Sequence, residues 1–399
     1  MKSALTAKNS VCQAAGEWFL KSGIQESNGG VARYYFSDRQ CNAPLTTEIT
    51  AYYAGGLLAM YQQSRESRYL DAALKAALYL VRAWDEEASA MPFECDSEGK
   101  KYSYFFDNGI IVRSLLALWR ECGNSDFLSM AQKVGDSMAR DFSDGKNFSP
   151  ILELPTKTPL PYEPARWSRS PGCYQLKAAM GWYELGLATK DERYDAFYRN
   201  LLDASLVSHA SFLPGVDSEI PVMDRLHAYS YFLEGLLPAV EERACAEAMA
   251  DGINRAAGFV RRISPVFLRS DVVAQLLRAR LFADQHGVLP LDEAASQEEI
   301  ETLQSFQSDD SDVRLSGIGQ PDQVREHCCP LMRERWIRRL REARKRLFIP
   351  GIEPVMRIVR RHGHVKIGVK AVGRHLHHEQ RTMKGKCTQH DQPEGNGTA

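Results

Sequence analysis

Apolar and polar positions along the chain follow a pattern that occurs three times. Each copy has an apolar helix end, a polar turn, and then Tyr or Phe opening a second helix; the copies lie at residues 55–80, 112–138 and 181–206. In every copy nine residues separate the last apolar position from the aromatic one: Met60 and Tyr69, Leu118 and Phe127, Leu185 and Tyr194. This spacing predicts a helix, a tight turn and a second helix.

Weaker helical patterns continue the series on both sides. Residues 227–243 and 244–263 form a fourth pair, 269–285 begins a fifth, and 10–23 is a lone helix before the first pair. Alternation typical of strands is confined to short pieces such as 31–36. Successive copies are 58 and 67 residues apart, too long for the roughly 34-residue tetratricopeptide unit, so each hairpin carries a further long loop. We therefore predict an all-α fold of helical hairpins.

The long connections, rich in Pro, Gly and aromatic residues, all lie between an outer helix and the next inner one. They occupy residues 29–45, 91–106, 149–172 and 211–224. Because they alternate with the short turns, they fall on one side of the repeat, and long loops often carry function. We expect this side to be the functional face.

Hairpins of this length, with aromatic-rich loops before each inner helix, resemble the six-hairpin glycosidase superfamily. Its members include unsaturated uronyl hydrolases, N-acylglucosamine 2-epimerase-like enzymes and polysaccharide lyases. The resemblance covers about residues 10–290 and implies an (α/α)6 toroid that acts on a carbohydrate. In that superfamily, acids or histidines at the starts of the inner helices line a funnel and act on a sugar. The residues at equivalent places here are Glu48, Asp107, His227 and Asp271.

Glu48 opens the apolar stretch TTEITAYYAGGLL. On a helix beginning with the second threonine it shares a face with Tyr52, which makes this tyrosine a candidate for substrate binding. Gly55 and Gly56 would each cost about 1 kcal/mol in a helix interior, so we expect them to admit a closely packed neighbouring helix. The alternative is that Glu48 is an ordinary residue of a first helical turn. Acids favour the first turn of any helix, and the preceding threonines are suitable N-caps.

Asp107 follows the aromatic run YSYFF. Aromatic faces beside a carboxylate suit sugar stacking, so Tyr104 is a second candidate for substrate binding. Asp is itself a good N-cap, and aromatic side chains are common in cores, so a purely structural role stays open.

His227 has a side chain suited to proton transfer near neutral pH, and Tyr229 beside it is a further candidate to contact the sugar. A hydrogen-bonded structural histidine is the alternative. Asp271 follows Ser270, a plausible N-cap, so it too can be an ordinary residue of a first helical turn.

Arg166 and Trp167 lie in the longest of the predicted connections, residues 149–172. An arginine there can pair with a substrate carboxylate, and a tryptophan can stack on a pyranose ring. The alternative is a loop tied to Glu153 or Glu163.

Three kinds of function stay open for the funnel. Two facing carboxylates would hydrolyse a glycosidic bond, one as acid and the other as base or nucleophile. His227 with Tyr52 or Tyr229 would instead abstract a proton beside a carbonyl or carboxylate, as a lyase or epimerase does. A non-catalytic scaffold that binds polysaccharide or protein is the third. The sequence has no HExxH, P-loop, GxGxxG or GxSxG motif, and we expect neither a metal site nor a cofactor.

Charge divides the chain in two. Residues 321–399 carry 18 basic and 8 acidic side chains, the rest carry 32 and 43, and seven of the ten histidines lie in the basic part. We predict a toroid domain at 1–317 and a basic, His-rich tail at 318–399, partly disordered, with one amphipathic helix at 333–348. The tail stands where an apolar hairpin would close the ring, so we expect the sixth hairpin to be incomplete or altered.

Compartment and partners follow from the same composition. No apolar stretch approaches the roughly 18 residues of a membrane span and none reads as a signal peptide, so we expect a cytoplasmic protein without a membrane span. The nine cysteines lack CxxC spacing and fit reduced thiols. A carbohydrate is the expected partner and nucleic acid is not, while the pattern carries no signal about oligomeric state.

Overall fold

The computed structural model of the chain describes residues 14–95, 99–145, 147–163, 166–213, 219–264 and 267–308, with short strand segments at 317–318, 358–361 and 364–367. The chain divides into two compact units, Met1–Leu340 and Arg341–Ala399. In the second unit the described residues form one antiparallel pair, β8 (Ile358–Arg361) with β9 (His364–Ile367). The amphipathic helix expected at 333–348 lies outside the described residues, and the boundary expected at 317 stays a prediction.

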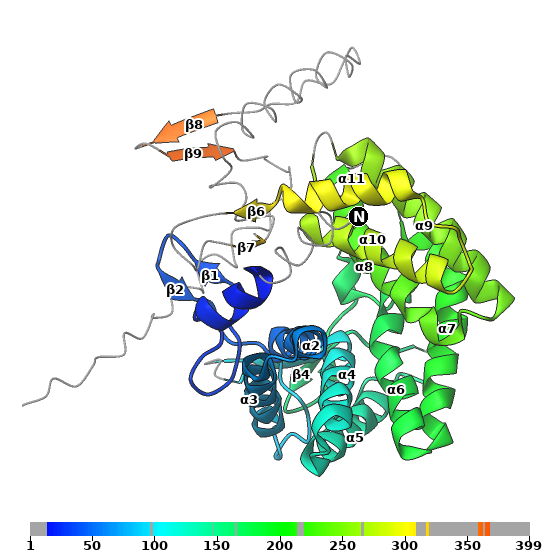
Figure 1. The fold of residues 1–399 in the computed structure, drawn as a ribbon. Helices are drawn as coiled ribbons and strands as arrows, with labels where there is room; N and C mark the ends of the chain where they lie inside the picture. The colour runs from blue at the N-terminus through cyan, green and yellow to red at the C-terminus, as the bar shows by residue number, and fades with distance from the viewer. Residues whose placement is uncertain are drawn as a thin grey trace, which may run out of the picture. The chain divides into compact units, whose positions relative to one another are not determined.

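Five helical hairpins make up most of the described part of the first unit (Figure 1). They are α2 (Thr47–Ser64) with α3 (Ser67–Ala83), α4 (Phe105–Cys122) with α5 (Ser125–Asp141), α6 (Leu176–Thr189) with α7 (Glu192–Phe212), α8 (Glu219–Gly235) with α9 (Arg243–Ile263), and α10 (Ser270–Gln285) with α11 (Glu293–Gln304). The helices of each hairpin pack together, and α2, α4, α6, α8 and α10 pack against one another in that order. These five form an inner layer and their partners an outer one. The predicted all-α class is confirmed, and the place of a sixth hairpin lies outside the described residues.

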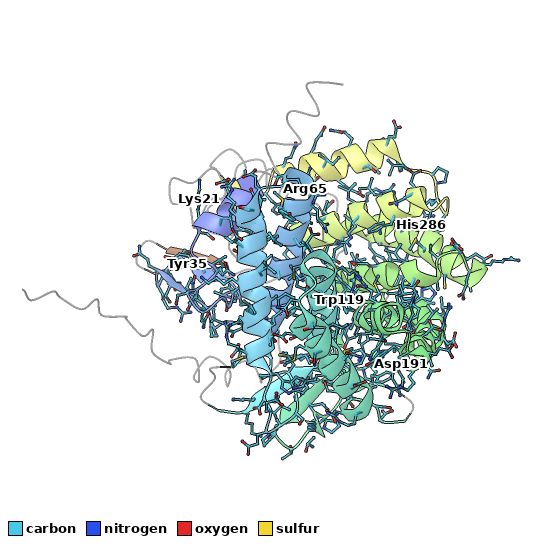
Figure 2. The ribbon with its side chains drawn as sticks, turned by 60° about the horizontal axis from the view of Figure 1, so that its bottom comes forward. Lys21, Tyr35, Arg65, Trp119, Asp191 and His286 are labelled. Carbon is cyan, nitrogen blue, oxygen red and sulfur yellow. The ribbon has the colours of Figure 1, made fainter. Side chains whose placement is uncertain are left out.

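The short turns end three inner helices in the same way. The C-caps of α2, α4 and α6 all have left-handed backbone: Arg65 at φ 62°, Gly123 at φ 72° and Lys190 at φ 63°. The next helix then begins on a side-chain N-cap in two of these hairpins, Asn124 for α5 and Asp191 for α7. Figure 2 labels Arg65 and Asp191 at their turns. The left-handed C-cap and the short turn that follows it explain why nine residues separate the two apolar positions in each copy.

Close contact between inner helices occurs at Gly109 and not at the glycine pair expected to provide it. A Cβ atom added to Gly109 would lie 2.4 Å from the Cα atom of Ala178, so α4 and α6 meet backbone to backbone there. At Gly55 an added Cβ would lie 3.3 Å from Ser114 Oγ, and at Gly56 no other part of the described chain comes within 4 Å. The predicted close packing is therefore limited to one side-chain contact at Gly55. The prediction is wrong for Gly56, which is exposed.

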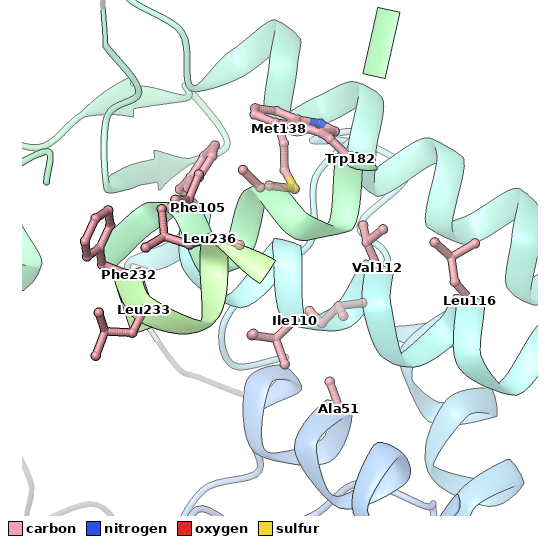
Figure 3. Close-up of a cluster of buried hydrophobic side chains, with 14 of the residues drawn as sticks. Ala51, Phe105, Ile110, Val112, Leu116, Met138, Trp182, Phe232, Leu233 and Leu236 are labelled. Carbon is pink, nitrogen blue, oxygen red and sulfur yellow. The ribbon is translucent and has the colours of Figure 1, made fainter. Parts of the chain in front are cut away.

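The hydrophobic core lies between the helical layers, and Figure 3 shows part of it around α4 and α6. Trp182, fully buried on α6, meets the ring of Phe105 edge-on with 5.5 Å between ring centroids. Its Nε1 donates to the carbonyl of Gly135 on α5 at 2.9 Å. Phe105 is the first residue of α4, so this packing fixes where α4 begins and how its first turn is oriented.

Three of the four predicted long connections, 29–45, 91–106 and 149–172, precede inner helices and contain strands. The prediction is wrong for 211–224: Phe212 still belongs to α7 and Asp224 lies in α8, because a proline such as Pro221 is tolerated in the first turn of a helix. His227 is therefore the ninth residue of α8 and not at its start.

β3 (Lys101–Tyr104) pairs with β4 (Ile151–Leu154), and β4 with β5 (Thr158–Pro159), in one antiparallel sheet that joins the loops before α4 and α6. The remaining short elements are β1 (Tyr35–Phe36) with β2 (Cys41–Asn42), β6 (Gln307–Ser308) with β7 (Gly317–Ile318), and the 3-10 turns η1 (Trp167–Arg169), η2 (Cys173–Gln175) and η3 (Leu237–Ala239). No helix in the described ranges is both long and apolar enough to cross a membrane.

Candidate functional site

Two acidic side chains lie at the starts of neighbouring inner helices. Glu48 is in the first turn of α2 and Asp107 in the first turn of α4. The N-cap of α2 is Thr46, whose hydroxyl oxygen accepts a bond from the N–H of Ile49 at 3.4 Å, and the N-cap of α4 is Tyr104. The alternative in which Asp107 caps its own helix is therefore excluded.

Asp107 has the more strongly raised pKa of this acid pair. Asp107 is 7% exposed, and its Oδ2 atom has no hydrogen-bond partner within the described structure. Burial raises the pKa of Asp107 well above its usual value, the charge of Glu48 raises it further, and Arg33 opposes both effects. Burial also raises the pKa of Glu48, but Arg33 and Lys177 both oppose this rise. Because two cations oppose the rise at Glu48 and only Arg33 opposes it at Asp107, Asp107 favours its protonated form more strongly than Glu48 does.

His227 on α8 and Asp271 on α10 form a second pair. Nδ1 of His227 lies 3.0 Å from Asp271 Oδ2 and 3.2 Å from the Gln275 amide, and Nε2 lies 2.6 Å from the Tyr231 hydroxyl. Burial alone would raise the pKa of Asp271, but hydrogen bonds from His227 and Arg269 outweigh burial and hold this pKa below its usual range. An ionised carboxylate only accepts hydrogen bonds, so Nδ1 donates to Asp271, and Nε2 is the ring nitrogen that faces the Tyr231 hydroxyl.

Two tyrosines and a lysine connect the acid pair with the histidine pair. The Nζ atom of Lys177 lies 5.3 Å from the ring centre of Tyr52 and 4.4 Å from that of Tyr231. Burial raises the pKa of both tyrosines well above the usual value, and the charge of Glu48 contributes to both shifts. Both hydroxyls therefore stay protonated, and a hydrogen bond joins Tyr52 to Tyr231.

Lys177 is held by a buried ion-pair network that sequence reasoning missed. Its Nζ atom lies 3.1 Å from Oε2 of Glu234, and Oε1 of Glu234 lies 3.2 Å from both Arg113 and Arg278. Burial opposes the charge of Glu234, but Lys177, Arg278 and Arg113 outweigh burial and lower its pKa to about 2. A single charge within the apolar stretches LKAAMGWY and YFLEGLL was a usable signal, because such residues are rarely buried without a partner.

The two loop candidates have different surroundings. Trp167 donates from Nε1 to Asp224 Oδ2 at 2.5 Å, and its ring meets the His227 ring edge-on with 6.4 Å between centroids. Arg166 is exposed and lies 3.9 Å from Glu163, which matches the alternative in which the loop is tied to that glutamate. The structure therefore brings Trp167, but not Arg166, to the histidine pair.

Tyr104 lies beside the acid pair, whereas Tyr229 does not join either pair. Burial is the main cause that raises the pKa of Tyr104, and Asp107 is the neighbouring group with the next largest effect. Tyr229 is fully buried in the hydrophobic core, with its hydroxyl 3.1 Å from Nδ1 of His209. Residues two apart on a helix point to different faces, whereas Tyr231, four residues after His227, shares its face. Tyr231 thus occupies the place that the sequence assigned to Tyr229.

Within the described part of the chain, no three His, Cys, Asp or Glu side chains gather so that they could hold a metal ion. The titratable groups that do gather span α2, α4, α6, α8 and α10, and they are carboxyl, imidazole, phenol and ammonium groups. This set is suited to proton transfer.

Solved structures with the same arrangement of helices include three enzymes. Cellobiose 2-epimerase from Spirochaeta thermophila DSM 6192 matches with a TM-score of 0.60 and 15% identity over 77% of this chain and 87% of that one. A D-mannose isomerase matches at 0.59 and 12% over 80% and 94%. An alpha-amylase from Clostridium perfringens matches at 0.54 and 11% over 77% and 91%. No protein-family profile matches this chain, and no curated protein sequence is significantly similar to it. At these identities the likeness establishes the fold, and it confirms the predicted toroid of helical hairpins.

Proposed function

Because the chain has the helical-hairpin toroid fold of the six-hairpin glycosidase superfamily, we propose that it is a carbohydrate-active enzyme that hydrolyses a glycosidic bond at Glu48 and Asp107. One observation carries the proposal: Asp107 is nearly buried, its Oδ2 atom has no partner among the described residues, and burial together with the charge of Glu48 raises its pKa well above the usual value. Enzymes with this fold are named for cellobiose epimerisation, mannose isomerisation and amylase activity, which supports a sugar as the substrate.

In the proposed reaction Asp107 gives its proton to the glycosidic oxygen while the bond to the leaving sugar breaks. The carboxylate of Glu48 either takes a proton from an attacking water or attacks the sugar carbon itself. Arg33 and Lys177 favour the charged form of Glu48 that either role requires. The buried hydroxyl of Tyr52, which hydrogen-bonds to Tyr231, can donate to a sugar oxygen in place of that contact.

Epimerisation or isomerisation at His227 is the second candidate. The observation that favours it is the orientation of the imidazole by Asp271 and Tyr231, which leaves Nε2 of a neutral ring as the proton acceptor. Such a base removes a proton from the sugar carbon next to a carbonyl once the Tyr231 hydroxyl gives way to substrate. A lyase would begin with the same step beside a carboxylate.

Incubating the full chain with cellobiose, gluco- and manno-oligosaccharides and uronate-containing oligosaccharides in D2O, followed by NMR, separates these reactions. Hydrolysis produces new reducing ends, epimerisation introduces deuterium at C2, and elimination produces an unsaturated uronate. We expect hydrolysis, with rates reduced by roughly 100-fold or more in Asp107→Asn and in Glu48→Gln. Glu163→Gln, which changes an exposed loop carboxylate, serves as the control and should leave the rate unchanged.

Two results would replace this assignment. Products deuterated at C2, together with an inactive His227→Gln variant, would move the chemistry to the histidine pair. Binding of an oligosaccharide without any product would make the chain a scaffold that binds carbohydrate.

A further inference from the structure

A chain of polar contacts runs from the loop before α6 to His227. Trp167 Nε1 donates to Asp224 Oδ2 at 2.5 Å, and Arg269 Nη1 donates to Asp224 Oδ1 at 2.7 Å. Arg269 also donates through Nη2 and Nε to the two oxygens of Asp271, at 2.6 and 3.0 Å. Asp271 Oδ2 in turn lies 3.0 Å from Nδ1 of His227. The contacts thus link η1, α8 and the start of α10.

The arrangement differs from an ordinary surface ion pair. The Arg269 side chain is 18% exposed and commits three nitrogens to two carboxylates, whereas that of Arg243 is 91% exposed and contacts Glu247 alone in the described structure. Both oxygens of Asp224 are occupied, one by Arg269 and the other by Trp167. Paired, charge-assisted hydrogen bonds of this kind fix orientation as well as contributing energy.

We propose that Asp224 and Arg269 are positioning residues that couple the Trp167 loop to His227, so that the indole and the imidazole are held as one sugar-binding unit. The sugar in this proposal rests on the proposed function, but the coupling does not depend on which bond is changed. Since the rings of Trp167 and His227 meet edge-on, a pyranose stacked on the indole would lie next to the imidazole.

The two positioning residues act on their neighbours by different physical routes. Asp224 holds the indole N–H by a directed hydrogen bond, so its effect on Trp167 depends on the carboxylate oxygen. Arg269 places a positive charge beside Asp271 and so weakens the attraction of that carboxylate for the ring proton of His227. Removing either Asp224 or Arg269 should therefore change the surroundings of both the Trp167 indole and the His227 imidazole, because the carboxylate–guanidinium pair links the two.

NMR spectra of the full-length protein test the coupling without a substrate. The indole N–H signal of Trp167 is assigned by its loss in Trp167→Phe, and the ring nitrogen signals of His227 by their loss in His227→Gln. We expect Asp224→Asn, which keeps the side-chain shape, to move both sets of signals, and Arg269→Gln to do the same. Arg243→Gln removes an arginine of equal charge from the exposed start of α9 and should move neither.

The conservative variant Arg269→Lys keeps the charge but has a single nitrogen, so we expect it to restore the His227 signals more fully than the Trp167 signal. Separate responses would overturn the proposal: Asp224→Asn moving only Trp167, and Arg269→Gln moving only His227. Titration with cellobiose distinguishes this failure from failure of the proposed function. Loss of sugar binding and turnover, with both signals still moving together in the variants, would count against the enzyme assignment and leave the coupling intact.

Discussion

Asp107 is the residue where stability and the proposed chemistry oppose each other. Its carboxyl is nearly buried, and Oδ2 lacks a hydrogen-bond partner in the described structure. Leaving a buried polar atom unpaired costs on the order of 1–3 kcal/mol, and functional sites tolerate such a cost when a ligand supplies the missing partner. A sugar hydroxyl or glycosidic oxygen would supply it here.

The pH dependence of stability should show this directly in Asp107→Asn. The folded-state pKa of Asp107 is raised above its unfolded value, so its contribution to stability is present below the unfolded pKa and is lost as pH rises toward the folded one. The asparagine does not titrate, so the variant should gain stability relative to the wild type as the pH rises above about 4, the usual pKa of an aspartate in an unfolded chain. Urea unfolding at three pH values measures the difference. If the free energy of unfolding of the wild type instead rose relative to that of the variant as the pH rises, the raised pKa of Asp107 would be contradicted. Asp126→Asn, at the exposed first turn of α5, is the control.

The inner helices contain glycines of two kinds. Gly109 lies where the backbones of α4 and α6 touch, so its missing side chain is a requirement of packing. Gly56 lies in the exposed middle of α2 with nothing near it, so it contributes only flexibility to the unfolded chain. The same residue type in the same helical layer thus has opposite effects on stability.

One substitution made at both positions should separate the two kinds. Gly56→Ala is expected to stabilise the protein by about 0.5–1 kcal/mol, because alanine is the better helix former and meets no other atoms. Gly109→Ala is expected to destabilise it by about 1–3 kcal/mol, because the new methyl group would press on the backbone of Ala178. Chemical denaturation of the two variants and the wild type gives both values. Equal effects at both positions would mean that the contact of α4 with α6 is looser than described.

The sequence predicted the elements better than it predicted the site, for physical reasons that individual residues show. Helix pairs follow from local spacing, and the first-turn position of Glu48 is a local property as well. The partners of Lys177 and Arg269 lie on other helices, so no local pattern pairs them with Glu234 or Asp224. Tyr229 is close to His227 in sequence, but the helical period places Tyr231, four residues after His227, on the same face of α8.

At the scale of the whole molecule, the groups of the candidate site come from the described hairpins and from the loops that precede their inner helices. The polar side chains that surround the two pairs come from residues between Arg33 and Arg278.

A chain that ends after Ile318, which retains the pairing of β6 with β7, tests the predicted boundary. If the toroid domain ends near residue 317, the shortened protein should unfold cooperatively within a few degrees of the full chain and keep its activity on whichever sugar the screen identifies. Calorimetry and the activity assay measure the two properties. A large drop in the unfolding temperature, or loss of activity, would show that the later residues help to complete the ring.

The spread of the site along the chain has a consequence during synthesis. Glu48 belongs to the first described hairpin and Asp271 to the fifth. The first hairpins can fold while the ribosome is still making the rest, since folding proceeds from the N-terminus as the chain emerges. The imidazole and its aspartate meet only when α10 has left the exit tunnel. The acid pair on α2 and α4 can therefore form before the histidine pair on α8 and α10, so the two parts of the candidate site are completed at different stages of synthesis.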